Sequence, residues 1–139
     1  MSWLLALLAQ ASAPATPSPL PPPSAEVAQE IVVIGTRAKT WRGGMTKRDG
    51  RLVCRTKQST GDREIDAVRC GAMLRCAAPH VAEMDRIAAS DLAREERNRQ
   101  LTAIITGTMP CMDEAGRVGI RMLAEQREGQ DRRVGAATR

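Results

Sequence analysis

The chain has 139 residues, enough for one small domain, and carries a formal charge of +5 with a pI near 9.6. It contains neither Phe nor Tyr and only two Trp, so any hydrophobic core must be built from Leu, Ile, Val, Met and Ala. Small domains with such modest cores often need covalent staples. The sequence shows no constellation of catalytic side chains and no cofactor motif, so we expect a protein that is not an enzyme and that has no cofactor.

The N-terminus is typical of a secretory signal. Met1 to Ala11 reads MSWLLALLAQA, in which the apolar run from Trp3 to Ala9 is too short to span a bilayer. Ala9-Gln10-Ala11 fits the small-x-small rule for signal cleavage. No Lys or Arg precedes the apolar run, so either the signal is weak or the true start lies upstream. We predict a signal peptide over residues 1–11, export to the periplasm of a Gram-negative cell or secretion, and no transmembrane helix in the mature chain.

Three further segments follow the signal. Residues 12–26 include six of the eight prolines, a composition typical of an extended, solvated linker. Residues 27–128 are predicted to form the single folded domain. Residues 129–139 are polar and contain Gly and Ala, and we expect a disordered tail there.

The first half of the domain indicates strands. Ile31 to Ile34 is a run of β-branched residues ending at a glycine, which predicts a short strand. Gly43-Gly44 and Asp49-Gly50 indicate a loop or a wide hairpin turn. RLVCRTKQ (51–58) and EIDAVRC (64–70) are predicted to form a hairpin through the turn cluster STGDR (59–63). The three strands would form one small antiparallel sheet.

The second half indicates helices. Good helix formers run from His80 to Gly107, with a change of apolar face near Ser90-Asp91 that predicts a bend, where either residue would cap a second helix. Gly107 and Pro110 would end this helix, and a last one is predicted over residues 112–128. The predicted fold class is therefore α+β: a small antiparallel hairpin or three-stranded sheet followed by two or three helices and stapled by disulfides.

The four cysteines are Cys54, Cys70, Cys76 and Cys111. An even number in a small secreted chain indicates two disulfides, and four cysteines allow three pairings. We favour Cys54–Cys70, on adjacent predicted strands, although the hairpin register that this needs is not fixed by sequence. The remaining pair, Cys76–Cys111, would tie the helical part together across a loop worth roughly 3–4 kcal/mol in the chain-entropy model.

A cytosolic metal- or nucleic-acid-binding module is the alternative. Its metal ligands would be Cys70, Cys76, His80 and Cys111, spaced C-x5-C-x3-H-x30-C. Zinc sites normally contain a tight C-x2–4-C knuckle, which this chain lacks. His80, the only histidine, is more simply interpreted as an exposed residue at a helix start. The compartment separates this alternative from the secreted protein.

The strongest electrostatic feature lies between residues 37 and 58, where eight basic residues and one acidic residue give a formal charge of +7. Such a segment attracts anionic partners. No nucleic-acid-binding motif is present, so we expect no nucleic acid; the expected partner is a cell-envelope protein or an anionic envelope surface. The alternative is a solvated basic loop paired with Glu95 and Glu96. The predicted anion- or partner-binding residues are Arg37, Lys39, Trp41, Arg42, Lys47, Arg48, Arg51, Arg55 and Lys57.

Glu30 to Arg37, EIVVIGTR, resembles the TonB box, the energy-coupling motif near the mature N-terminus of bacterial TonB-dependent outer-membrane receptors. The remaining chain is too short for the barrel and plug of that family, so the resemblance does not imply a receptor. The order of signal, spacer, box-like segment and cysteine-stapled domain is also similar to small secreted proteins of alphaproteobacteria. The resemblance implies that Ile31, Val32, Val33 and Ile34 add a strand to a partner's sheet; the alternative is that they form the first strand of the domain itself.

Overall fold

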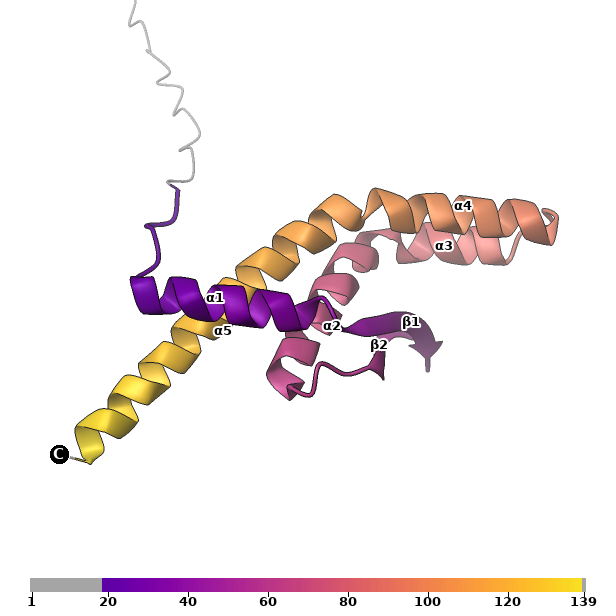
Figure 1. Ribbon diagram of the computed structural model, residues 1–139. Coiled ribbons are helices and arrows are strands. Elements are labelled where there is room, and N and C mark those ends of the chain that lie inside the picture. The colour runs from indigo at the N-terminus through magenta and orange to yellow at the C-terminus, as the bar shows by residue number, and fades with distance from the viewer. Residues whose placement is uncertain (1–18, 139) are drawn as a thin grey trace, which may run out of the picture.

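The computed structural model describes residues 19–138, and over this range the chain forms helices and one two-stranded antiparallel sheet (Figure 1). This confirms the predicted α+β class with a small antiparallel hairpin and two disulfides, but the hairpin pairs residues 42–48 with 51–58, not 51–58 with 64–70 as predicted. The predicted signal peptide, residues 1–11, lies outside the described residues. The elements, in order, are α1 (Ala25–Ala38), β1 (Arg42–Arg48), β2 (Arg51–Gln58), α2 (Arg63–Ala77), the 3₁₀ turn η1 (Ala78–His80), α3 (Val81–Ala88), α4 (Arg94–Gly107) and α5 (Met109–Ala137).

The predicted first strand is wrong, because Ile31–Ile34 lies inside helix α1. The side chain of Ser24 caps this helix by accepting a hydrogen bond from the Val27 N–H at 3.3 Å. Val27, Ile34 and Ala38 are buried, and Ile31 packs against them, so the buried positions follow a helical period. β-branched residues weaken a helix by only a few tenths of a kcal/mol each, which the burial of this face offsets.

The hairpin joins β1 to β2 through Asp49 and Gly50. Both residues have positive φ, 50° and 73°, as a two-residue type I′ turn requires. Arg48 and Arg51 form the closing pair of the ladder, and Met45 lies opposite Cys54. Asp49-Gly50, which was predicted to be a loop or a wide turn, is therefore a tight hairpin turn.

The predicted third strand, Glu64–Cys70, is also wrong and belongs to helix α2. The turn cluster before it is the start of this helix. Asp62 accepts hydrogen bonds from the backbone N–H of Glu64 and Ile65 at 3.0 and 3.2 Å. An aspartate in this position satisfies N–H groups that the first turn of a helix leaves unpaired. This capping stabilises the helix relative to the predicted strand.

The remaining helices follow the predicted order but differ from the prediction at their ends. α3 and α4 are separated near Ser90, as predicted, but neither Ser90 nor Asp91 caps α4, whose N-cap is Ala93. The Ser90 hydroxyl instead donates to the Ile87 carbonyl at 2.6 Å. Pro110 lies in the first turn of α5, where its missing N–H costs nothing.

Helix α5 also reaches Ala137, so residues 129–137 are helical and the prediction of a disordered tail is wrong for them. Along this stretch Arg132 pairs with Glu128 at 2.8 Å, one helical turn away. Within residues 19–138 no helix combines the length and the apolar character needed to cross a membrane.

The two disulfides join Cys54 to Cys70 and Cys76 to Cys111, which confirms the favoured pairing. The reason given for the first pair was wrong, because Cys54 lies on β2 but Cys70 lies on α2. One bond therefore fastens the hairpin to α2, and the other fastens the end of α2 to the start of α5.

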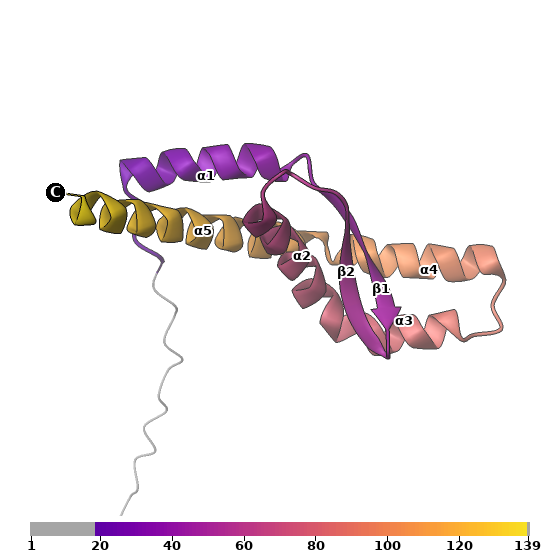
Figure 2. The ribbon, with the colours of Figure 1, turned by 90° about the horizontal axis from the view of Figure 1, so that it is seen from below.

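The core lies where α1, α2 and α5 meet, and α1 and α2 both pack against α5 (Figures 1 and 2). Its fully buried side chains include Ile34 and Ile65, with Leu123 and Ala124 supplied by α5. The hairpin lies along α2 with its tip beside α3, as Figure 2 shows. α3 and α4 form a helical arm that extends away from this core.

Candidate functional site

The two faces of the hairpin have different surroundings. Side chains alternate along a strand, and residues opposite each other in the ladder share a face. Cys54 points toward α2 through its disulfide, and its neighbour in the ladder, Met45, shares that inner face. Lys47, also on the inner face, reaches Asp85 of α3 at 2.5 Å. The positions that alternate with these, which include Arg48 of β1 and Arg51, Arg55 and Lys57 of β2, form the outer face.

The outer face carries a group of exposed cations that we call the cationic face: Arg48, Arg51, Arg55 and Lys57. Within residues 19–138, none of these side chains makes an ion pair or a hydrogen bond. Arg48 and Arg51 are directly opposite each other, and like charges in that position destabilise a ladder. The fold therefore keeps four positive charges together without a neutralising carboxylate.

A hollow of about 500 Å³ lies on the hairpin beside these residues. Gly44 and Thr46 of β1 and Arg55 and Lys57 of β2 contribute to its lining. Gly44 has no side chain, which leaves space in the hollow. A Cβ at this position would have Cε and Nζ of Lys57 as its nearest atoms, at 3.5 and 3.7 Å. The hollow presents two cations and a hydroxyl group, which suits an anion such as phosphate.

The structure separates the other predicted binding residues from this face. Trp41 is only 5% exposed, and its Nε1–H donates to Thr56 Oγ1 at 3.2 Å, so it is part of the interior and not available to a membrane interface. Arg37 lies 3.7 Å from Asp62, and Arg42 donates to the backbone carbonyls of Lys39 and Trp41.

Of the nine predicted residues, the structure thus gathers four. Lys39 instead lies at the end of α1, in a hollow that residues of α5 also line. Neither Glu95 nor Glu96 pairs with the basic segment: Glu96 forms an ion pair with Arg99 in its own helix, and within residues 19–138 Glu95 forms none. The prediction missed Gly44 and Thr46, although two adjacent glycines without side chains, Gly43 and Gly44, indicated that this part of the basic segment leaves space for a ligand.

The strand-addition candidate, Ile31 to Ile34, does not form a free edge. Ile34 is fully buried and Ile31 packs against the core, whereas Val32 and Val33 point outward from helix α1. A helix whose backbone groups bond within itself offers no ladder to a partner's sheet. The resemblance of residues 30–37 to a TonB box therefore stays a sequence prediction, without the strand that it implies.

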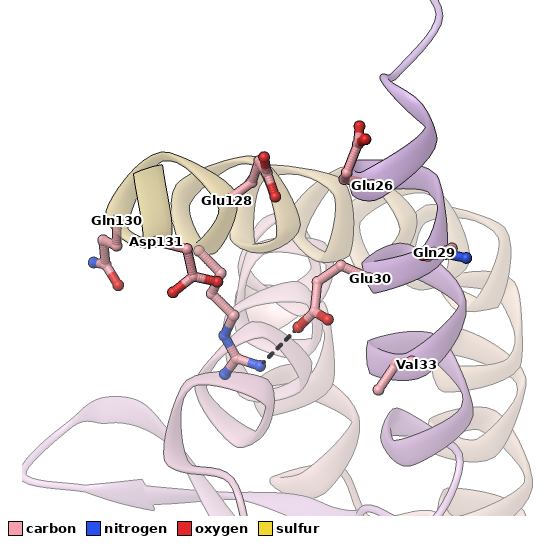
Figure 3. Close-up of a pocket in the computed structure, with 8 residues that line it drawn as sticks. Glu26, Gln29, Glu30, Val33, Glu128, Gln130 and Asp131 are labelled. Carbon is pink, nitrogen blue, oxygen red and sulfur yellow. Dashed lines mark hydrogen bonds and ion pairs between the residues drawn. The ribbon is translucent and has the colours of Figure 1, made fainter. Parts of the chain in front are cut away.

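A second charged cluster surrounds Arg127 of α5. Its guanidinium pairs with Asp62 at 2.7 Å, Glu64 at 2.8 Å and Glu30 at 3.3 Å. Figure 3 shows Glu26, Glu128 and Asp131 around the adjoining hollow, which has a volume of about 370 Å³. Since the one cation at its base already has three carboxylate partners, we interpret this cluster as a structural tie between α1, α2 and α5.

The ion pairs around Arg127 shift the ionisation of its partners. Burial acts to raise the pKa of Asp62, but the hydrogen bonds from Arg127 and from the N–H groups of Ile65 and Glu64 outweigh it and lower the pKa. Burial likewise acts to lower the pKa of Arg127, and its bonds to Glu64, Asp62 and Glu30 raise it instead. Both shifts favour the charged forms of Asp62 and Arg127.

The alternative metal site cannot form in this fold. Cys70, Cys76 and Cys111 are all disulfide-bonded, which removes three of the four candidate ligands. His80 ends the turn η1 and is half-buried.

Comparison with protein families, with curated proteins and with solved structures found no match for this chain. The function must therefore be inferred from its own geometry.

Proposed function

We propose that this protein is a non-enzymatic secreted or periplasmic protein that binds an anionic surface of the cell envelope through the cationic face. The observation that carries the proposal is the group of four exposed cations on one face of the hairpin, which is kept together at an electrostatic cost. A bound phosphate-bearing surface would remove that cost and add charge-assisted hydrogen bonds.

The disulfides support the compartment. Two disulfides use all four cysteines of the chain, and structural disulfides persist mainly in oxidising compartments such as the periplasm. In that compartment the abundant anions are lipid headgroups and lipopolysaccharide phosphates, and the hairpin presents its cations on a rigid support. Cys54–Cys70 fixes β2 to α2 directly behind the face.

The test is cosedimentation of the disulfide-bonded protein with vesicles that contain phosphatidylglycerol, compared with vesicles of phosphatidylcholine alone. We expect binding to the anionic vesicles only, and weaker binding at high salt, since salt screens exposed charges. Each Lys or Arg near an anionic surface contributes about 1 kcal/mol, so Arg55→Gln with Lys57→Gln should weaken binding about 30-fold.

The matched control removes the same charge elsewhere. Arg132→Gln with Arg133→Gln alters two exposed residues of α5, far along the chain from the hairpin, and we expect vesicle binding within twofold of the parent protein. Equal losses in both double variants would mean that net charge alone drives binding. Unchanged binding in the Arg55/Lys57 variant would show that the hairpin is not the binding surface.

A further inference from the structure

A cavity of about 370 Å³ is lined by residues of α1, α2 and α5, none of which belongs to the cationic face. Its apolar lining includes Ile31 of α1 with Gly116 and Ile120 of α5. A volume of this size is at the lower end of the range for small-molecule sites, about 300–1,000 Å³. The cavity can therefore hold a small molecule with a short hydrocarbon part.

Arg69 of α2 lines this cavity without a protein partner. Its Nε is buried and has no hydrogen-bond acceptor, and within residues 19–138 its guanidinium makes no ion pair. The guanidinium carbon lies 5.7 Å from the centre of the Trp41 ring, which holds the cation by its π face. A buried donor without an acceptor is costly, so native structures rarely keep one without a reason.

Gly116 makes room for this arginine. A Cβ at that position would lie 3.3 Å from Nη1 of Arg69, closer than side chains normally approach. The glycine thus leaves room for the guanidinium between α5 and the Trp41 ring, with the cavity beside it.

The charges around the cavity favour an anion. Lys39 and Arg117 also line it, and Asp113 is the one carboxylate in the lining. Arg117 already pairs with Glu114, which leaves Lys39 and Arg69 as the cations without a carboxylate partner among the described residues. A planar guanidinium matches a carboxylate with two parallel hydrogen bonds, while the isoleucines match a hydrocarbon chain.

We propose that this cavity binds a small amphiphilic carboxylate, with its headgroup on Arg69 and Lys39 and its hydrocarbon chain over Ile31 and Ile120. The site is separate from the cationic face and does not depend on the function proposed for it. The ligand would give the Arg69 guanidinium an anionic partner, and Arg69 connects the cavity to the ring of Trp41, the one tryptophan among the described residues.

The test uses octanoate as the probe and the full-length, disulfide-bonded chain carrying Trp3→Phe, so that Trp41 alone reports by fluorescence. We expect a saturable change in Trp41 emission, and a dissociation constant from calorimetry that agrees with it. Acetate has only the headgroup and 1-octanol only the chain, so each should bind at least about tenfold more weakly than octanoate. No saturable response to octanoate, or an equal response to 1-octanol, would overturn the proposal.

Substitutions of residues that line the cavity then test whether octanoate binds there. Arg69→Gln should abolish calorimetric binding, whereas Arg75→Gln, an exposed arginine of the same helix, should leave it unchanged. Because Arg69→Gln also removes a contact with Trp41 and so tests folding together with binding, two rim variants provide an independent check. Lys39→Gln should weaken octanoate binding and Asp113→Asn should tighten it, each about two- to fivefold.

Unchanged affinity in both rim variants would overturn the assigned site. The Arg55→Gln/Lys57→Gln variant of the hairpin should bind octanoate as the parent does, so failure of this proposal and failure of vesicle binding are distinguishable.

Discussion

Gly43 lies where β1 begins to pass over the ring of Trp41. A Cβ at position 43 would lie 2.2 Å from both Cζ2 and Cη2 of that ring, so the ring or the strand must move. Trp41 is only 5% exposed and is held by Thr56 and Arg69, which leaves it little room. The glycine is therefore required by packing and not by its backbone angles.

We expect Gly43→Ala to lower the free energy of unfolding by about 1–3 kcal/mol, the usual cost of overpacking a filled site. Urea denaturation followed by Trp41 fluorescence measures the change. Gly44→Ala is the matched control, because a Cβ at position 44 meets only Lys57 at an ordinary 3.5 Å. That neighbour should change stability by no more than about 0.5 kcal/mol. Equal effects at both glycines would contradict the described packing of Trp41.

At the scale of the elements, α1 can be tested against the strand that its sequence indicates. In a strand, Val32 and Ile34 would share one face, whereas in a helix Ile34 shares a face with Val27, Ile31 and Ala38. Ile34 is 0% exposed and Val32 is 67% exposed, as only the helix allows. We expect Ile34→Ala to cost about 2–5 kcal/mol and Val32→Ala no more than about 0.5 kcal/mol. Thermal and urea unfolding of the two variants measures the difference; similar losses would support the strand.

The same element shows what the sequence could predict. The run from Ile31 to Ile34 has local β propensity, and the helical period appears only when Val27 and Ala38 are included on either side. Tertiary packing against Ile65 and Leu123 decides between the two, and a single sequence does not contain those contacts. Asp62 gave a local helix-start signal, but it also fits a turn, so the strand prediction after it was wrong.

The candidate sites were also only partly predictable from the sequence. The basic residues of the hairpin could be identified directly from the sequence, and Asp49-Gly50 indicated a turn between its strands. Their division into an outer cationic face and an inner, paired set depends on the ladder register, which the sequence left open. The burial of Trp41 and the unpartnered Arg69 arise from contacts between distant segments, so neither was predictable.

At the scale of the whole molecule, few long-range ties hold the helices together. The disulfides fasten α2 to β2 and to α5, and Arg127 fastens α5 to α1 and to the start of α2. The hydrophobic core between these helices is small and lacks Phe and Tyr. The Arg127 cluster should therefore contribute measurably to the stability of the fold, and its contribution should depend on pH.

The direction of that dependence follows from Asp62. Its pKa is lower in the folded chain than the ordinary value of 3.8, so the ionised folded state is favoured above that pH, and the contribution is lost as pH falls through the folded pKa. We expect Arg127→Met to destabilise the protein by about 2 kcal/mol at pH 7, chiefly because it removes the closest cation from Asp62, whose side chain is only 15% exposed. At pH 2.5, well below the ordinary pKa of 3.8 and nearer the lowered pKa of Asp62, part of this contribution is lost, and the deficit should shrink. Urea unfolding at both pH values measures it. Arg132→Met, which removes only an exposed pair with Glu128, should cost no more than about 0.5 kcal/mol at either pH. A deficit in Arg127→Met that is equal at pH 7 and pH 2.5 would mean that Arg127 acts through packing of its hydrocarbon stem and not through its charge.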